Sequence, residues 1–199
     1  MSIVTCDITV SVDGYVAGPR QSLENPIGEG GERLHRWIFD PTPEDQRIID
    51  DWQGPTGSYV MGRNMFSPGR GEWDPEWTGW WGPEPPYGVP VFVLTHHARD
   101  PLPVGATTFH FVTDGVESAV DRARSAAGER SVSIAGGAST ANQALSAGLV
   151  DRLHLHVTPV VLGSPGERLF EGVPGVELEP LQVVGSPDVT HVKYAVRRP

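Results

Sequence analysis

The stretch SIAGGASTANQAL, residues 133–145, decides the interpretation of the fold. Apolar residues typical of a strand lead into Gly136 and Gly137, and small residues then begin a segment typical of a helix. Thr140 and Gln143 have the spacing of a capping box. A strand that turns through glycines into a helix brings backbone N–H groups and the positive end of the helix dipole together. The stretch therefore predicts either a phosphate-binding turn or an ordinary strand-to-helix connection.

Polar residues also follow two other predicted strands. Arg63 comes directly after one apolar run, and Thr95 and His96 end another. An arginine guanidinium binds phosphate as a planar fork, and the strand ends of an α/β sheet gather at one edge, where ligands bind. Three such segments together favour an anion-binding site. The alternatives are a surface ion pair for Arg63 and a solvated turn for His96.

Composition restricts the class of protein. The chain has 199 residues, a length typical of one domain, and its formal net charge of −10 argues against a general nucleic-acid or anionic-membrane surface. The single cysteine, Cys6, excludes a disulfide framework and a cysteine-based zinc or iron–sulfur site, and no metal is predicted. Lys193 is the only lysine, and there is no P-loop motif. Because the sequence has no secretion signal and no membrane-spanning run, we expect a cytoplasmic protein.

Predicted helices and strands alternate along the chain. A helix begins after the capping residue Thr42 and ends at Gly54-Pro55. Residues 67–88 form a loop rich in Gly, Pro and Trp, and a loop of this length is more often functional than idle. Segments 176–186 and 189–199 have the pattern of an antiparallel hairpin. Alternating helices and strands that end in a hairpin predict a mixed sheet flanked by helices.

Several motifs occur in an order that resembles the dihydrofolate-reductase-like proteins. They are ITVSVDGYVAG (8–18), YVMGRNMF (59–66), VPVFVLTHH (89–97), SIAGGASTANQALSAGLVDRLHLHVTPVVLG (133–163) and RLF (168–170). The most similar branch contains the C-terminal reductase domain of the riboflavin-biosynthesis deaminase-reductase, and the likeness spans nearly the whole chain. The resemblance implies a single α/β domain over residues 1–199, with three αβα layers, a mixed, mostly parallel sheet and a C-terminal antiparallel hairpin.

The resemblance also implies an NADPH-binding fold. The strand–Gly-Gly–helix stretch would cradle the diphosphate, Arg63 would face the 2′-phosphate or the diphosphate, and Thr95 and His96 would meet the adenosine end. Residues 12–17 would lie along the nicotinamide, and the Gly136–Gly137 peptide bond is expected to be cis. The cofactor-binding residues expected on these grounds are Asp13, Gly14, Tyr15, Gly62, Arg63, Thr95, His96, Gly136, Gly137, Ala138, Ser139 and Thr140.

A reductase also needs a proton donor beside its substrate. Dihydrofolate reductases have a carboxylate early in the first helix, and Asp45 or Glu44 takes this place here; both would equally suit the helix dipole. His154 and His156 alternate on one predicted strand and share a face, and the resemblance puts His156 near the substrate pocket. Histidine is suited to proton donation near neutral pH, although a hydrogen-bonded core histidine is the alternative. The predicted catalytic residues are Asp45 and His156.

These observations and the resemblance together predict an NADPH-dependent reductase, expected to be a homodimer. Its substrate would be a pyrimidine- or pteridine-like heterocycle or a ribosylamino derivative, such as the 5-amino-6-(5-phosphoribosylamino)uracil of riboflavin biosynthesis. The alternatives are a dihydrofolate reductase, a non-catalytic nucleotide-binding dimer of the same fold, and a protein that binds a flavin or deazaflavin. The four tryptophans of residues 67–88 would cover an aromatic heterocycle or form a dimer surface.

Overall fold

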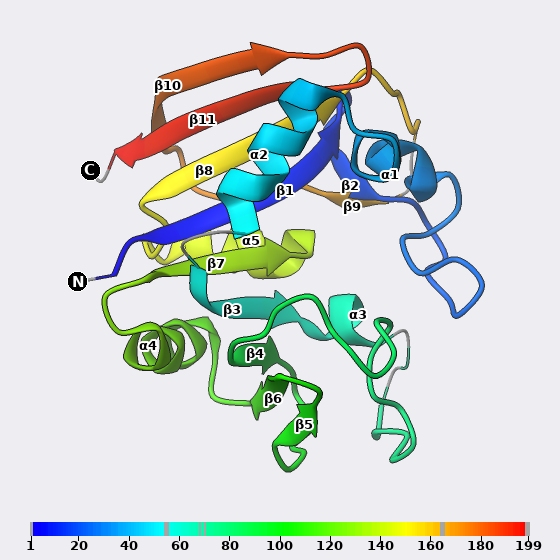
Figure 1. Ribbon diagram of the computed structural model, residues 1–199, viewed down its shortest axis with the longest axis vertical. Coiled ribbons are helices and arrows are strands. Elements are labelled where there is room, and N and C mark those ends of the chain that lie inside the picture. Colours follow the sequence, from blue (N-terminus) through cyan, green and yellow to red (C-terminus); the bar gives the residue numbers. More distant parts are fainter. Residues whose placement is uncertain (1, 54–55, 68, 70, 164–165, 198–199) are drawn as a thin grey trace.

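A nine-stranded mixed sheet is the centre of the computed structural model, which describes residues 2–53, 56–67, 69, 71–163 and 166–197. The strand order is β10-β11-β8-β1-β7-β3-β4-β6-β5 (Figure 1). The bounds of these strands are β1 Val4–Ser11, β3 Thr56–Gly62, β4 Val91–Leu94, β5 Leu102–Val104, β6 Thr107–Val112, β7 Ser131–Gly136, β8 Arg152–Thr158, β10 Glu177–Gly185 and β11 Thr190–Arg197.

The directions of the strands agree with the sheet predicted from the sequence. The six strands from β8 to β6 are parallel to one another, whereas β11 and β10 at one edge and β5 at the other are antiparallel to their neighbours. The α/β class, the mixed, mostly parallel sheet and the C-terminal antiparallel hairpin are therefore confirmed. A separate pair of short strands, β2 (Tyr15–Ala17) and β9 (Glu167–Arg168), was not predicted as a pair.

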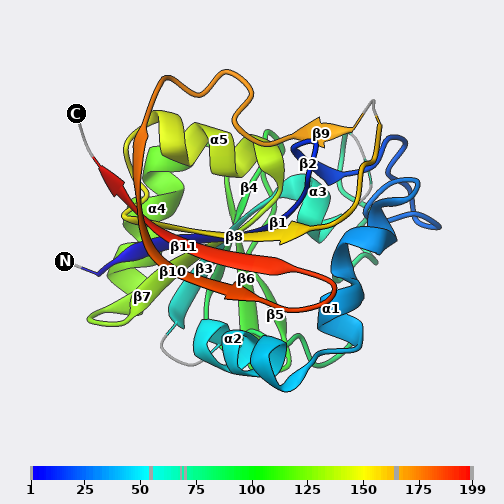
Figure 2. The same ribbon diagram turned by 90° about the horizontal axis from the view of Figure 1, so that it is seen from above.

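Helices cover both faces of the sheet, as the three-layer prediction requires. Helices α4 (Val116–Ala127) and α5 (Ala138–Ser146) lie on one face, and α2 (Pro43–Gln53) lies on the other (Figure 2). The short helices η1 (Gly31–His35) and α1 (Arg36–Phe39) lead into α2, and α3 (Arg63–Phe66) follows β3. Among the described residues, no helix is both long and apolar enough to cross a membrane.

The two faces of the sheet differ in polarity. Under α4 and α5 the buried side chains are apolar and include Cys6, Ile134 and Leu153. The strand register brings Asp7 beside His154, and His156 beside both Thr9 and His191, so polar side chains share the face under α2. Burying polar groups is unfavourable unless they are hydrogen-bonded, so this face requires a network of partners.

The segment between β3 and β4 packs as a second core. Residues 71–88 contain no helix or strand, but Trp73, Trp77 and Trp81 pack against a cluster that includes the buried Phe66 and Phe109. The indole N–H groups of Trp73 and Trp77 donate to backbone carbonyls, each over 2.8 Å. Aromatic burial and these hydrogen bonds give the loop a defined position without regular secondary structure.

The predicted cap at the start of α2 is observed, whereas the predicted cap at the start of α5 is not. Thr42 and Asp45 cap α2 reciprocally: the Asp45 N–H donates to the Thr42 hydroxyl (3.2 Å), and the Asp45 carboxylate accepts from the Thr42 N–H (2.9 Å). The capping box expected at Thr140 and Gln143 is wrong, because α5 already begins at Ala138 with Gly137 at its N-cap. The expected end of α2 at Gly54-Pro55 lies outside the described residues.

Candidate active site

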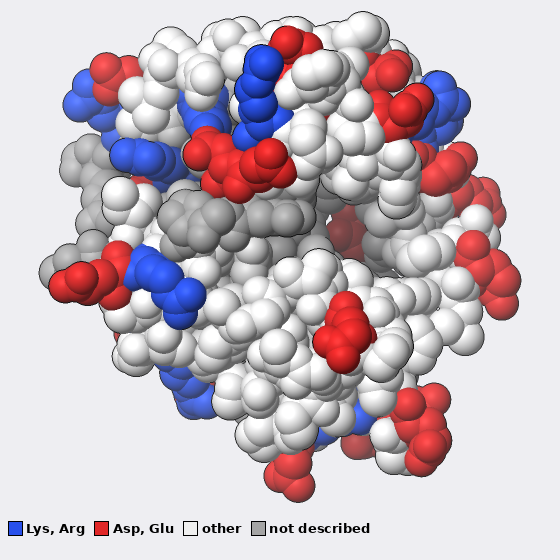
Figure 3. Space-filling model, in the orientation of Figure 1, with Lys and Arg blue, Asp and Glu red and all other residues white. Residues whose placement is uncertain are grey.

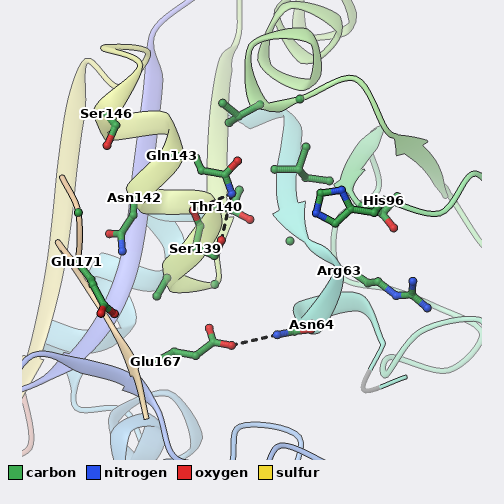
Figure 4. Close-up of a pocket in the computed structure, with 18 of the residues that line it drawn as sticks. Arg63, Asn64, His96, Ser139, Thr140, Asn142, Gln143, Ser146, Glu167 and Glu171 are labelled. Atoms are coloured by element: carbon green, nitrogen blue, oxygen red, sulfur yellow. Dashed lines mark hydrogen bonds between the residues drawn. The ribbon is translucent and has the colours of Figure 1, made fainter. Parts of the chain in front are cut away.

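A large cavity of about 1110 Å³ lies at the carboxyl ends of β3, β4 and β6, opposite the N-terminus of α5 (Figure 4). The three polar segments that the sequence predicts at strand ends all line this cavity. Eight of the expected cofactor-binding residues line it, namely Gly62, Arg63, Thr95, His96, Gly137, Ala138, Ser139 and Thr140. The prediction that separate strand ends meet at one edge of the sheet is confirmed by this geometry.

The N-terminus of α5 lines part of this cavity. The first intrahelical hydrogen bond runs from Ala141 N to Gly137 O at 3.1 Å, so the N–H groups of the three preceding residues have no intrahelical acceptor and are available to an anion. The peptide bond between Gly136 and Gly137 is cis, as expected. A Cβ atom on Gly62 would lie 2.5 Å from the Thr140 hydroxyl, so the close approach of β3 to α5 requires glycine there.

Arg63 lies at the edge of the large cavity. Its guanidinium carbon sits 4.0 Å from the centroid of the Trp73 ring, and Nη2 donates to the Glu72 carbonyl over 3.4 Å. In Figure 4 the side chain points away from Ser139 and Thr140. The structure thus brings Arg63 to the end of the cavity beside His96, rather than over the helix N-terminus.

A smaller cavity of about 420 Å³ continues from the large one on the α2 face of the sheet. Asn64, Gly137 and Glu167 line both cavities, and Asn64 Nδ2 donates to Glu167 Oε1 over 3.0 Å where they meet (Figure 4). The walls of the smaller cavity are largely apolar and aromatic, and they include Tyr59, Trp80, Trp81 and Tyr87. The face that carries α2 is also hollowed near its centre, and its basic side chains are interspersed with acidic ones (Figure 3).

His156 and Gly136 line the smaller cavity. His156 is 3% exposed, and its Nδ1 lies 2.8 Å from Nδ1 of His191 on the neighbouring strand β11. Burial lowers the pKa of His156 to about 3, so the imidazole is neutral at physiological pH. His154 also carries a partner, because its Nδ1 lies 2.6 Å from the buried carboxylate of Asp7, which is another residue of the cavity wall.

The structure does not bring Asp45 to either cavity. This carboxylate caps α2 and accepts a hydrogen bond from Nε2 of His191 at 2.9 Å. Burial opposes its ionisation, but the hydrogen bonds from His191 and Thr42 lower the pKa of Asp45 overall. Glu44, the alternative, forms an exposed ion pair with Arg47 on the same helix. The catalytic role expected for Asp45 stays a prediction: α2 turns this side chain toward the sheet and His191, not toward either cavity.

Asp13, Gly14 and Tyr15 also line neither cavity. The Asp13 carboxylate accepts hydrogen bonds from the N–H groups of Leu162 (3.1 Å) and Gly163 (2.9 Å), so it joins the turn after β1 to the segment after β8. Slight burial opposes ionisation, but bonds from Ser11 and these backbone groups lower the pKa of Asp13 to about 2. Within residues 12–17, the structure brings Val16 and Ala17 to the smaller cavity instead.

Asn64 and Glu167 are site residues that the sequence interpretation missed. Asn64 directly follows Arg63 and was available as a candidate from that position alone. Glu167 lies 103 residues further along the chain, on a strand of only two residues that has no periodic signal. Its place beside Gly137 depends on the pairing of β9 with β2, which is a long-range contact.

Solved structures share this architecture, which is that of the dihydrofolate-reductase-like proteins. A protein described as a riboflavin biosynthesis protein, from Shewanella sp. PV-4, matches with a TM-score of 0.67, 22% identity and 100% of both chains covered. The riboflavin biosynthesis reductase of Saccharomyces cerevisiae matches with a TM-score of 0.59, 14% identity, and 99% of this chain and 89% of that chain covered. Dihydrofolate reductase from Enterococcus faecalis, complexed with NADP(H), matches with a TM-score of 0.58 and 15% identity, and 98% of this chain and 97% of that chain are covered.

The family is shown by the sequence itself. Residues 2–191 match the RibD C-terminal domain, and the chain belongs to this family, which confirms the resemblance seen in the motifs. No curated protein matches the sequence.

Proposed function

We propose that this protein is an NADPH-dependent reductase of a pyrimidine- or pteridine-like heterocycle. The observation that carries the proposal is the junction of the two cavities at Asn64 and Glu167: one cavity has the features of a nucleotide site, and the other has those of a site for a flat aromatic ring. Such a junction puts a bound cofactor and a bound substrate in contact, which is the condition for hydride transfer.

The large cavity suits a dinucleotide phosphate. The N–H groups of residues 138–140 would hold the diphosphate at the helix N-terminus, and Gly62 lets β3 approach closely enough to complete the cradle. Arg63 and His96, at the far end, would bind the 2′-phosphate that distinguishes NADPH from NADH. When bound, the cofactor supplies the hydride. The complex of the similar E. faecalis reductase with NADP(H) supports this assignment.

The small cavity suits an aromatic heterocycle. Trp80, Trp81 and Tyr87 provide flat apolar surfaces, while Asp7 and Glu167 are acceptors for ring N–H or amino groups. A ribosylamino derivative of a pyrimidine would place its ring here and its sugar toward the junction. The riboflavin biosynthesis reductase among the similar structures supports a substrate of this class.

The test is whether the protein oxidises NADPH in the presence of each of a panel of heterocycles. The readout is the loss of NADPH absorbance. Oxidation with 5-amino-6-(5-phosphoribosylamino)uracil or a related ribosylaminopyrimidine is expected, and dihydrofolate is the comparison substrate. Turnover of dihydrofolate alone would identify a dihydrofolate reductase instead. Binding of NADPH without oxidation by any heterocycle would favour the non-catalytic alternative.

A further inference from the structure

Three buried side chains form a continuous hydrogen-bonded chain from helix α2 to the small cavity. Asp45 Oδ1 accepts from Nε2 of His191 over 2.9 Å, and Nδ1 of His191 lies 2.8 Å from Nδ1 of His156. None of the three is more than 3% exposed. The buried ring of Trp37 packs against both imidazoles, with centroid distances of 4.7 and 4.9 Å. The geometry of the pair is therefore fixed by packing as well as by hydrogen bonds.

The protons in this chain follow from its donors and acceptors. Because the carboxylate of Asp45 only accepts, His191 carries a proton on Nε2. The bond between the two Nδ1 atoms contains one proton. When His191 is neutral, that proton belongs to His156, and Nε2 of His156 is an acceptor. When His191 takes up a second proton, its Nδ1 becomes the donor, and the neutral His156 then carries its own proton on Nε2.

We infer that Asp45, His191 and His156 form a proton relay that ends at the small cavity. His156 lines this cavity, and its Nδ1 is used by His191, so it would exchange a proton with substrate through Nε2. Asp45 and His191 are positioning residues, which hold the extra proton and set the tautomer of His156. In this assignment Asp45 acts on the site through His191 and does not itself line the cavity.

The inference rests on the proposed function, because reduction of a carbon–nitrogen double bond needs a hydride on carbon and a proton on nitrogen. A bound nicotinamide would supply the hydride. As the substrate N–H bond forms, the Nε2–H bond of His156 breaks, and the Nδ1 proton of the His191 imidazolium moves to Nδ1 of His156. His191 is left neutral, and its hydrogen bond to the Asp45 carboxylate remains. One proton from solvent then restores the starting state.

The charged and titratable groups around the histidine pair have partners of their own or are neutral. Asp7 on β1 is paired with His154 on β8, and Lys193 on β11 forms an ion pair with Asp51 on α2. His35, from η1, lines the cavity, and burial lowers its pKa, so it is neutral. Asp45 is thus the carboxylate in hydrogen-bond contact with His191. Burial lowers the pKa of His156, so this ring is the neutral member of the pair.

Imidazole ¹⁵N NMR of the substrate-free wild-type protein tests this directly. We expect a ¹⁵N–¹⁵N coupling across the hydrogen bond between the two Nδ1 atoms. As the pH is lowered, His156 should stay neutral and switch from the Nδ1–H to the Nε2–H tautomer. Absence of the coupling, or a His156 tautomer that does not change with pH, would overturn the relay.

Two matched substitutions on α2 separate the relay from general charge effects. Asp45→Asn should lower the pH at which His156 switches tautomer by about one unit or more, because a neutral amide at position 45 does not stabilise a proton in the relay. Asp51→Asn, the same change on the same helix at an exposed ion pair, should leave the pH of this switch unchanged. Equal shifts in both variants would contradict the assignment, and thermal melting shows whether each is folded. If Asp45→Asn does not fold, the wild-type spectra decide.

The spectra need neither cofactor nor substrate, so they separate this inference from the proposed function. Uncoupled histidines beside normal NADPH turnover would remove the relay and leave the reductase. Coupled histidines in a protein that binds no nicotinamide nucleotide would exclude the proposed reductase function. The histidine pair would then exist but would have no role in reduction. Where turnover is measured, Asp45→Asn should lower kcat more than it changes KM, and Asp51→Asn should change neither.

Discussion

Asn64 and Glu167, which are 103 residues apart in the chain, are joined by a hydrogen bond of 3.0 Å where the two cavities meet. Glu167 Oε2 would lie 3.1 Å from a Cβ atom on Gly137, so its charge is close to the cradle at the N-terminus of α5. A carboxylate at this position would repel a diphosphate and, at the same time, attract an N–H group of a substrate.

Glu167→Gln should therefore tighten NADPH binding by about threefold while it weakens the substrate. The amide keeps the shape and the acceptor for Asn64 but removes the charge. Calorimetric titration measures the affinity, and Glu171→Gln, an exposed change in the large cavity, is the control and should have a smaller effect. Weaker NADPH binding in Glu167→Gln would show that the carboxylate contacts the cofactor favourably.

Gly62→Ala tests the close approach of β3 to α5. The new methyl group would meet the Thr140 hydroxyl at 2.5 Å, so Thr140 must move away from the cradle. We expect a loss of about 1–3 kcal/mol in the free energy of unfolding, together with weaker NADPH binding. Gly175→Ala is the control, because nothing lies within 4 Å of the added carbon. Unchanged melting and affinity in Gly62→Ala would contradict the proposed cradle.

Arg63→Ala separates the two nicotinamide cofactors. A charge-assisted bond to the 2′-phosphate contributes about 1.5–3 kcal/mol, so NADPH should bind correspondingly more weakly, and NADH should bind as before. Arg47→Ala, on the exposed side of α2, should alter neither affinity. An equal loss for NADPH and NADH would place Arg63 at the diphosphate, and no loss would mean that it only packs on Trp73.

Stability should depend on pH through the buried histidine pair. The pKa of His156 is lowered to about 3, so between about pH 6.5 and 3 the unfolded chain binds a proton there that the folded protein does not. The free energy of unfolding should therefore fall with decreasing pH in this window, by about 1.4 kcal/mol per pH unit per proton. Asp45, whose pKa is also lowered, acts in the same direction at lower pH.

Urea unfolding at a series of pH values measures this dependence. His156→Gln should flatten the curve below pH about 6.5, although the variant is less stable at neutral pH because it loses the bond to His191. His96→Gln, at an exposed position, should keep the wild-type slope. A steep slope that survives His156→Gln would mean that another group causes the acid sensitivity.

The local features of the sequence were predicted well because local chemistry determines them. The strand, the two glycines and the helix of residues 131–146 form a unit whose geometry depends on neighbouring residues, and the N–H groups of α5 lie where that unit predicts. Arg63 and His96 were found because strand ends in a parallel sheet share an edge. The capping box at Thr140 failed because the N-cap of α5 is Gly137, three residues earlier.

The remaining site depended on tertiary contacts. The periodicity of α2 gives its apolar face but not the direction in which Asp45 points, and only the docking of α2 on β8 and β11 brings Asp45 to His191. His191 lies in the terminal hairpin and meets His156 through the pairing of β11 with β8. Asp13 was expected at the cofactor because the family resemblance implies that residues 12–17 lie along the nicotinamide, whereas its hydrogen bonds hold the segment after β8.

The most direct test of the central claim is calorimetric titration of the purified protein with NADPH, NADH, FMN and FAD. Micromolar binding of NADPH, much weaker binding of NADH and no binding of the flavins is the predicted result, because in the proposed complex the N-terminus of α5 would hold the diphosphate and Arg63 the 2′-phosphate. Tight binding of a flavin, or no binding of NADPH, would contradict the assignment of this protein as a nicotinamide-dependent reductase.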